Sequence, residues 1–233
     1  MIEQKDFEIY LYVKNDKFEI FLFDALTFKN IYTNELIINK DSLIDFKELI
    51  KFLDDNIFKI EKLSNRFIED IFLIIDTNTE LHTDISIKKK NNNDIISFKN
   101  LNQTLIELKD LFKENNKEQE IIHMLVENFL IDGKNYKFFV ENLKSDYLNL
   151  DVKFITLPEK FILKLNKIFE RYHIKVKYFI SAKYLKKFID SENIEISLMA
   201  HKILNGHNVN EIAIVPKTRE NKGFFEKFFQ LFS

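Results

Sequence analysis

Histidines are the side chains of this 233-residue protein best suited to bind a metal or to transfer a proton at neutral pH. The five of them are His82, His123, His173, His201 and His207. No two stand four residues apart beside a carboxylate, which is the arrangement of helical zinc sites. His123 alternates with Ile and Leu and is expected to be a satisfied strand histidine, whereas His201 and His207 flank a helix end and are expected to be solvated. The histidines therefore predict no metal site.

Nucleophiles and acid–base pairs show no catalytic pattern either. The chain has no cysteine, which excludes disulfides, thiolate catalysis and cysteine-based metal sites. Adjacent carboxylates such as Asp54-Asp55 border predicted helices and strands, where solvated ends are expected rather than an acid–base pair. The serines with no elbow or partner motif are Ser42, Ser64, Ser97, Ser145 and Ser181. We predict no catalytic residue and no enzyme activity.

Phosphate and nucleic-acid binding are disfavoured by composition. Glycine lets a backbone wrap closely around phosphate, and this chain has only 3 glycines and 2 prolines. A formal net charge of −2 gives no general attraction to nucleic acid. The three lysines at 88–90 stand next to three asparagines and are expected to form a solvated hairpin tip, because no aromatic residues are interleaved with them. The sequence predicts no cofactor and no nucleic-acid partner.

The chain start and the distribution of apolar residues predict a cytoplasmic location. The first residues, MIEQKDFEIYLYVKND, are too charged for a signal peptide. No stretch approaches the roughly 18 apolar residues that a membrane-spanning helix needs.

The elements that would position these side chains are of both kinds, which predicts an α+β fold. Residues 7–13 and 17–24 are strand-like runs joined by a hairpin signal, and residues 28–38 extend the meander. Residues 41–63 switch to a helical period, and residues 71–76 form a short buried strand.

The remaining chain continues this alternation. The predicted strands are 81–88, 94–98, 118–130, 149–156 and 174–180, and the predicted helices are 100–114, 158–173, 181–190 and 194–204. Asp132-Gly133 is predicted to be a turn, and Gly206 is predicted to cap the last of these helices. The polar residues 207–222 are predicted to form a flexible linker.

The last eleven residues, GFFEKFFQLFS, form the sharpest motif. On a helix their apolar side chains fall on one half of the circumference, with Glu226, Lys227 and Gln230 on the other half. The predicted membrane-binding residues are Phe224, Phe225, Phe228, Phe229, Leu231 and Phe232, assisted by Lys222 and Lys227 on an anionic leaflet. The alternative is that this helix packs on the protein's own core or in a protein groove. A single copy is expected to bind weakly, so clustering would strengthen attachment.

The stretch 120–185 resembles the subdomain of FtsA, the bacterial cell-division actin homologue, that replaces a normal actin subdomain. The matching pieces are IDG at 131–133, VKFIT at 152–156, IFER at 168–171 and IKV at 174–176. The resemblance implies a partial actin-like (ribonuclease H-like) sheet domain at 1–117, an inserted FtsA-type α/β subdomain at 118–190 and a short helix at 191–206. A linker at 207–222 and an amphipathic membrane-targeting helix at 223–233 complete this division.

The departures from FtsA concern the nucleotide. The family's first phosphate loop is an Asp-x-Gly-Thr hairpin, whereas this chain has Val13-Lys14-Asn15-Asp16-Lys17. The second, glycine-rich phosphate loop and most of the second half of the actin fold are missing. The resemblance therefore implies a reduced relative that has lost ATP hydrolysis, a pseudo-ATPase.

The function implied is that of a non-enzymatic cell-division scaffold at the cytoplasmic face of the membrane. Its expected partners are division proteins (FtsZ or the cytoplasmic tail of a membrane division protein), anionic lipid and further copies of itself. The alternatives are an actin-like adaptor of type IV pilus or secretion machinery, and a small soluble protein-binding module.

Overall fold

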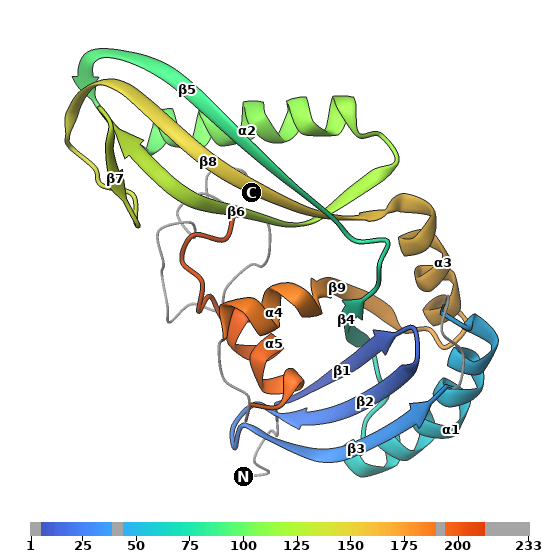
Figure 1. Ribbon diagram of the computed structural model, residues 1–233. Coiled ribbons are helices and arrows are strands. Elements are labelled where there is room, and N and C mark those ends of the chain that lie inside the picture. The colour runs from blue at the N-terminus through green and yellow to red at the C-terminus, as the bar shows by residue number, and fades with distance from the viewer. Residues whose placement is uncertain (1–5, 39–43, 190–193, 213–233) are drawn as a thin grey trace. The chain divides into compact units, whose positions relative to one another are not determined.

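The computed structural model describes residues 6–38, 44–189 and 194–212, and these divide into two compact units (Figure 1). Unit 1 contains the described residues of Met1–Glu80 and Lys160–Leu204, and unit 2 those of Leu81–Glu159 and Asn205–Ser233. The predicted α+β class is confirmed, because each unit combines one β-sheet with helices.

Unit 1 is built on a mixed five-stranded sheet in the order β3-β2-β1-β4-β9. Its strands are β1 (Phe7–Lys14), β2 (Lys17–Asp24), β3 (Lys29–Ile37), β4 (Asp70–Asp76) and β9 (Lys175–Ser181). The first three form an antiparallel meander, whereas β1, β4 and β9 are parallel. The parallel strands β1, β4 and β9 place their carboxyl ends at one edge of this sheet.

Four helices belong to this part of the chain: α1 (Phe46–Ser64), α3 (Glu159–Glu170), α4 (Ala182–Phe188) and α5 (Ile196–Leu204). Helix α1 begins where the Asp45 side chain accepts hydrogen bonds from two backbone amides, and it ends at Asn65, which adopts a left-handed conformation (φ 55°). Leu49, Phe52 and Leu53 form part of its buried face. The ring centroid of Phe52 lies 6.1 Å from that of Phe18 in β2, so α1 packs on the face of the sheet to which Phe18 points.

The described part of unit 2 is an antiparallel four-stranded sheet in the order β5-β8-β6-β7, with one helix packed on one face. Its elements are β5 (Leu81–Ile95), α2 (Phe98–Asn115), β6 (Gln119–Ile131), β7 (Lys134–Tyr136) and β8 (Lys144–Pro158). Apolar residues of α2 at spacings of three and four, including Leu101, Leu105, Leu108 and Phe112, bury against alternate residues of β6 and β8. The rings of Phe112 and Phe154 stack 4.4 Å apart within this core.

The units divide the chain differently from the predicted boundaries at 117/118 and 190/191. Strand β5 precedes the first predicted boundary but pairs with β8 from Leu81 to Ile95, which makes it part of unit 2. Strand β9 lies within the predicted 118–190 subdomain but pairs in parallel with β4, which makes it part of unit 1. Pairing between strands far apart in sequence decides these boundaries, and local patterns do not report it.

Three local predictions are corrected as well. The lysines at 88–90 lie within a continuous strand β5 rather than at a hairpin tip, and the ladder to β8 resumes at Asp94 after a register shift. His201 is buried, because it packs beside Phe23 and bonds Glu8. The predicted linker 207–222 begins with ordered residues, since Asn208, Glu211 and Ile212 are buried. The predicted helix 223–233 lies outside the described residues.

Candidate functional site

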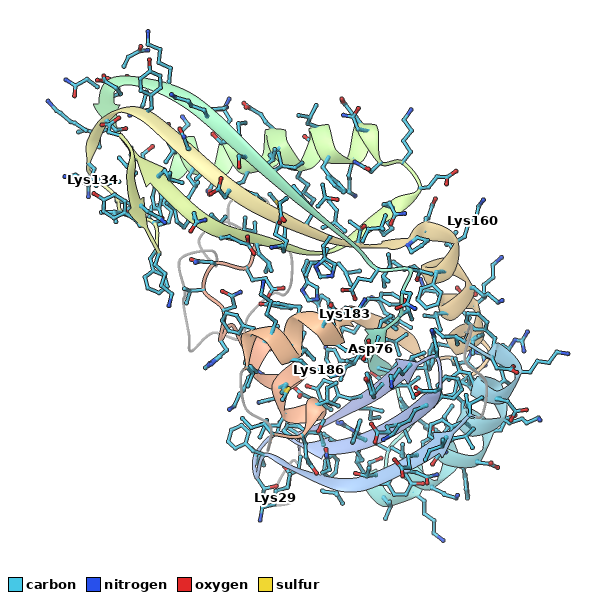
Figure 2. All side chains as sticks on the ribbon, in the orientation of Figure 1. Lys29, Asp76, Lys134, Lys160, Lys183 and Lys186 are labelled. Carbon is cyan, nitrogen blue, oxygen red and sulfur yellow. The ribbon has the colours of Figure 1, made fainter. Side chains whose placement is uncertain are left out.

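The carboxyl edge of the parallel strands in unit 1 gathers an aspartate, a tyrosine and a lysine. Asp76 ends β4 and is in register with Lys14 of β1, while Lys186 comes from α4, directly after β9. The Tyr12 hydroxyl donates to Asp76 Oδ2 at 2.6 Å, and Lys186 Nζ lies 2.9 Å from the same oxygen. Figure 2 labels Asp76 and Lys186. Lys186 also donates to the Tyr12 oxygen at 3.1 Å. Ligands of open α/β sheets bind beyond such carboxyl ends, so this cluster is the candidate ligand-binding or catalytic site of unit 1.

The charges in this cluster compensate one another. Burial raises the pKa of Asp76, but hydrogen bonds from Tyr12 and Lys186 and the positive charge of Lys186 outweigh it, so this pKa lies below its usual value. Burial, followed by the hydrogen bond to Asp76, raises the pKa of Tyr12 well above its ordinary value. Asp76 is therefore ionised and Tyr12 neutral at physiological pH. The arrangement is an ion pair of Asp76 and Lys186 with a tyrosine hydrogen-bonded to both.

The neighbouring β1–β2 turn is also made of ion pairs. Lys14 Nζ lies 3.0 Å from Asp16, and Lys17 Nζ lies 2.5 Å from Glu19 and 2.8 Å from Glu35. The turn joins Lys14 to Lys17 without a glycine, and this is the turn that the resemblance equates with a phosphate loop. Its lysines thus face carboxylates of the same chain.

Side-chain hydrogen bonds hold the segments that follow β4 and β9 in place. Lys183 Nζ donates to the Thr77 carbonyl at 3.0 Å, and the Ser181 hydroxyl donates to Glu80 at 2.8 Å. The Ser181 oxygen also accepts from the Tyr184 amide and caps α4. Within the described ranges, no cluster of three or more His, Asp or Glu residues could hold a metal ion.

In unit 2, one edge of the sheet is extended by the chain's own later residues. Ile212 N donates to Met124 O at 2.8 Å, and Val126 N donates to Asn210 O at 3.0 Å, so residues 210–212 run antiparallel to β6. We call residues 208–212 the clip. Strand β7 pairs only with Phe129–Ile131 of the same edge. Two short extended segments, residues 210–212 and β7, therefore pair with this edge of β6.

A buried hydrogen bond between His123 and Glu211 holds the clip. His123 Nδ1 lies 2.6 Å from Glu211 Oε1, and the side chains of both residues are almost fully buried (0% and 6% exposed). Ile212 joins the apolar core beneath α2, and Asn210 Nδ2 donates to the Lys137 carbonyl at 2.9 Å. The expectation that His123 is a satisfied strand histidine is confirmed. Its partner was missed, because the two residues are 88 positions apart and no local signal connects them.

The opposite edge of this sheet is β5, a strand of 15 residues. Ile85 and Ile87 are partly buried and pack against the α2 core, while the alternating residues face the polar side. On that side, Lys153 of β8 pairs with Asp84 (3.0 Å) and with Glu127. Towards the tip, Lys88 Nζ lies 4.2 Å from the Tyr147 ring centroid. This edge combines a long strand with apolar support on one face and lysines on the other.

The residues predicted to contact a membrane all lie outside the described residues. They are Lys222, Phe224, Phe225, Lys227, Phe228, Phe229, Leu231 and Phe232. No described helix is long and apolar enough to cross a bilayer.

Comparison with known proteins identifies no family. No protein-family model matches the chain, and no curated protein matches it. Among solved structures, the cytoplasmic domain of EpsL, an inner-membrane component of the type II secretion system of Vibrio cholerae, is similar with 9% identity and a TM-score of 0.41. That match covers 76% of this chain and 57% of the EpsL chain.

Two further structures are similar at the same low level. A PilM–PilN type IV pilus biogenesis complex matches with 6% identity and a TM-score of 0.48, covering 78% of this chain and 49% of the other. A Bacteroides thetaiotaomicron protein described as having an actin-like ATPase fold and unknown function matches with 12% identity and a TM-score of 0.33, covering 81% and 58%. This chain thus spans between about half and three fifths of each. Similarity at this level assigns no family and no activity.

Proposed function

We propose that this protein is a non-enzymatic adaptor that binds an extended segment of a partner protein along the β5 edge of unit 2 and works at the cytoplasmic face of a membrane. The observation that carries the proposal is the β5 edge itself. It offers a long, unshared edge among the described strands, with Ile85 and Ile87 on one face and lysines on the other.

The non-enzymatic part is supported by the carboxyl edge of unit 1. Asp76 is neutralised by Lys186, and the lysines of the β1–β2 turn face Asp16, Glu19 and Glu35. A phosphate group would have to compete with these carboxylates, and the turn has no glycine for a backbone cradle. These features favour a chain that no longer uses nucleotide.

The binding mode is strand addition, in which main-chain hydrogen bonds give affinity and alternate side chains give specificity. An added strand beside β5 would place every second residue next to Ile85 and Ile87 on the α2 face. The residues between them would lie near Lys88 and Lys90, both exposed. The partner segment should therefore alternate apolar residues with polar ones that include acidic side chains.

Two machineries supply the candidate partners. The resemblance to FtsA and the terminal GFFEKFFQLFS favour a divisome scaffold that binds FtsZ or the tail of a membrane division protein. An adaptor of type IV pilus or secretion machinery is the alternative, in which the partner is a short peptide segment of a membrane protein, and PilN of the PilM–PilN type IV pilus biogenesis complex is the candidate.

Peptides test the partner site directly. We would measure the affinity of the full chain for a peptide of the FtsZ C-terminal tail and for a cytoplasmic segment of a PilN-type protein. Binding of either peptide should fall at least tenfold in the variant Lys88→Glu/Lys90→Glu. The matched control, Lys160→Glu, changes an exposed lysine elsewhere and should bind as the unmodified chain does. If peptide affinity fell equally in both variants, or in neither, the β5 edge would not be the partner-binding site.

Titration with a fluorescent ATP analogue tests the non-enzymatic part separately. We expect no saturable binding at micromolar concentration, with or without magnesium. Micromolar affinity for the analogue would contradict the prediction of a pseudo-ATPase. It would not affect the conclusion drawn from peptide binding at the β5 edge.

A further inference from the structure

Strand β3 forms one edge of the five-stranded sheet of unit 1, and no other described strand pairs with its outer side (Figure 1). Its side chains alternate between exposed and half-buried along all nine residues. Ile31 and Ile37 are 46% and 67% exposed, and Leu26 and Phe28 in the preceding turn are exposed as well. Long edge strands with exposed apolar residues and no proline are templates for association with another strand.

The direction of the backbone groups along β3 follows from its pairing with β2. Ile38 N donates inward to the Asp16 carbonyl at 2.7 Å. Because successive residues of a strand direct their amide and carbonyl groups to opposite sides, residues 36 and 34 also face β2. Thr33, Glu35 and Ile37 then present their amide and carbonyl groups to the outer side of the sheet, whereas Ile31 lies at the register shift between β2 and β3.

Contacts with α1 hold β3 in this extended form. The Tyr32 hydroxyl donates to Asn56 Oδ1 at 2.6 Å, and Asn34 Nδ2 donates to the same oxygen at 2.8 Å. Asn56 is fully buried, and its own amide donates to the Phe52 carbonyl at 2.6 Å. The edge is therefore preorganised, which lowers the conformational entropy lost when another strand pairs with it.

We propose that β3 is a self-association surface, on which the β3 strands of two copies pair antiparallel around a two-fold axis at Asn34. In this register Ile31 of one copy opposes Ile37 of the other, and Thr33 opposes Glu35. Thr33 and Glu35 of each copy then pair through their backbone groups, and the exposed side chains of Ile31 and Ile37 lie next to each other. Paired apolar and β-branched side chains are favourable cross-strand neighbours.

Neighbouring two-fold registers are less favourable. An axis at Thr33 would oppose Ile31 with Glu35, and an axis at Glu35 would oppose the two Glu35 carboxylates directly. In the proposed register each Glu35 instead faces a threonine and keeps Lys17, 2.8 Å away in its own chain. The contact is isologous, so it closes as a dimer and forms no filament. It concerns two copies of this chain and is independent of the β5 edge.

Sedimentation velocity of the full chain over a concentration series tests the surface. We expect a concentration-dependent dimer that is lost in Ile31→Lys/Ile37→Lys. The matched control is Leu111→Lys/Leu163→Lys, which replaces two exposed leucines on α2 and α3. This control should dimerise like the unmodified chain, and circular dichroism should show that all variants are folded.

Cysteine cross-linking tests the register, since the natural chain has no cysteine. In Asn34→Cys the two cysteines face each other across the axis at about 4.5 Å between Cα atoms, within the range for a disulfide. In Thr33→Cys they are diagonal at about 7–8 Å, which is too far. Oxidation should link Asn34→Cys dimers much faster than Thr33→Cys dimers. A monomeric chain at every concentration, or a dimer that persists in Ile31→Lys/Ile37→Lys, would overturn the proposal.

Discussion

Asp76 illustrates how one side chain determines what the carboxyl edge of unit 1 does. Its side chain is 17% exposed and receives hydrogen bonds from both Tyr12 and Lys186. An aspartate at the carboxyl end of a parallel strand is well placed for catalysis, but here its negative charge is compensated by Lys186 of the same unit. The residue is therefore expected to act on stability.

Replacing Asp76 by Asn tests this role through pH. The folded state lowers the pKa of Asp76, so the ionised form contributes stability above the unfolded pKa, and this contribution is lost as pH falls through the folded pKa. We expect Asp76→Asn to cost about 1 kcal/mol near neutral pH, a value reduced for partial solvent screening. Urea unfolding should show the difference vanishing below the folded pKa; a pH-independent difference would contradict the ion-pair account.

Gly133 tests a backbone requirement. Asp132 and Gly133 have φ of 48° and 80° in the two-residue turn between β6 and β7, and a Cβ at Gly133 would meet nothing within 4 Å. The only cost of a side chain is therefore conformational, about 1–2 kcal/mol. Thermal unfolding should show Gly133→Val to be less stable than Gly133→Asn, because asparagine tolerates the left-handed region. Equal stability of the two variants would argue against this turn.

At the scale of elements, the clip shows how a short segment becomes part of a sheet. Residues 208–212 have too few apolar side chains for a strand prediction, yet Ile212 fills a place in the core under α2. The two backbone bonds to β6 and the bond between His123 and Glu211 then fix its register.

Breaking the bond between His123 and Glu211 should release the clip. Glu211→Ala leaves the buried His123 imidazole without this acceptor, and we expect a loss of about 1–3 kcal/mol in the stability of unit 2. Hydrogen exchange should become faster at the amides of Val126 and Ile212 in particular. Val209→Ala, a change at a neighbouring exposed residue, is the control and should leave both amides protected.

At the scale of the whole molecule, the terminal segment is proposed as a membrane contact. We expect removal of residues 223–233, or the double change Phe225→Glu/Phe229→Glu, to abolish co-sedimentation with anionic liposomes, because the apolar half of the helix would be lost. Lys227→Gln should weaken binding only slightly, by about 1 kcal/mol. Undiminished binding after truncation would show that another surface contacts lipid.

A dimer and a membrane-binding terminus would reinforce each other. Two copies joined through β3 bring two terminal segments to the same surface, and linked weak contacts bind more tightly than single ones. The charge changes at β3 should therefore also weaken liposome binding, without any change in the terminal segment itself.

The sequence by itself determined the α+β class, the positions of most helices and strands, and the turn at Asp132-Gly133. These depend on local periodicity, capping residues and φ preferences, which act over a few neighbouring positions. It also showed that the chain is poor in glycine and has no cysteine. Only the tertiary structure decided that β9 joins β4, that β5 joins β8, and that Glu211 meets His123. Those contacts join residues far apart in the chain, and their free energy comes from burial and pairing that exist only once the sheets have formed.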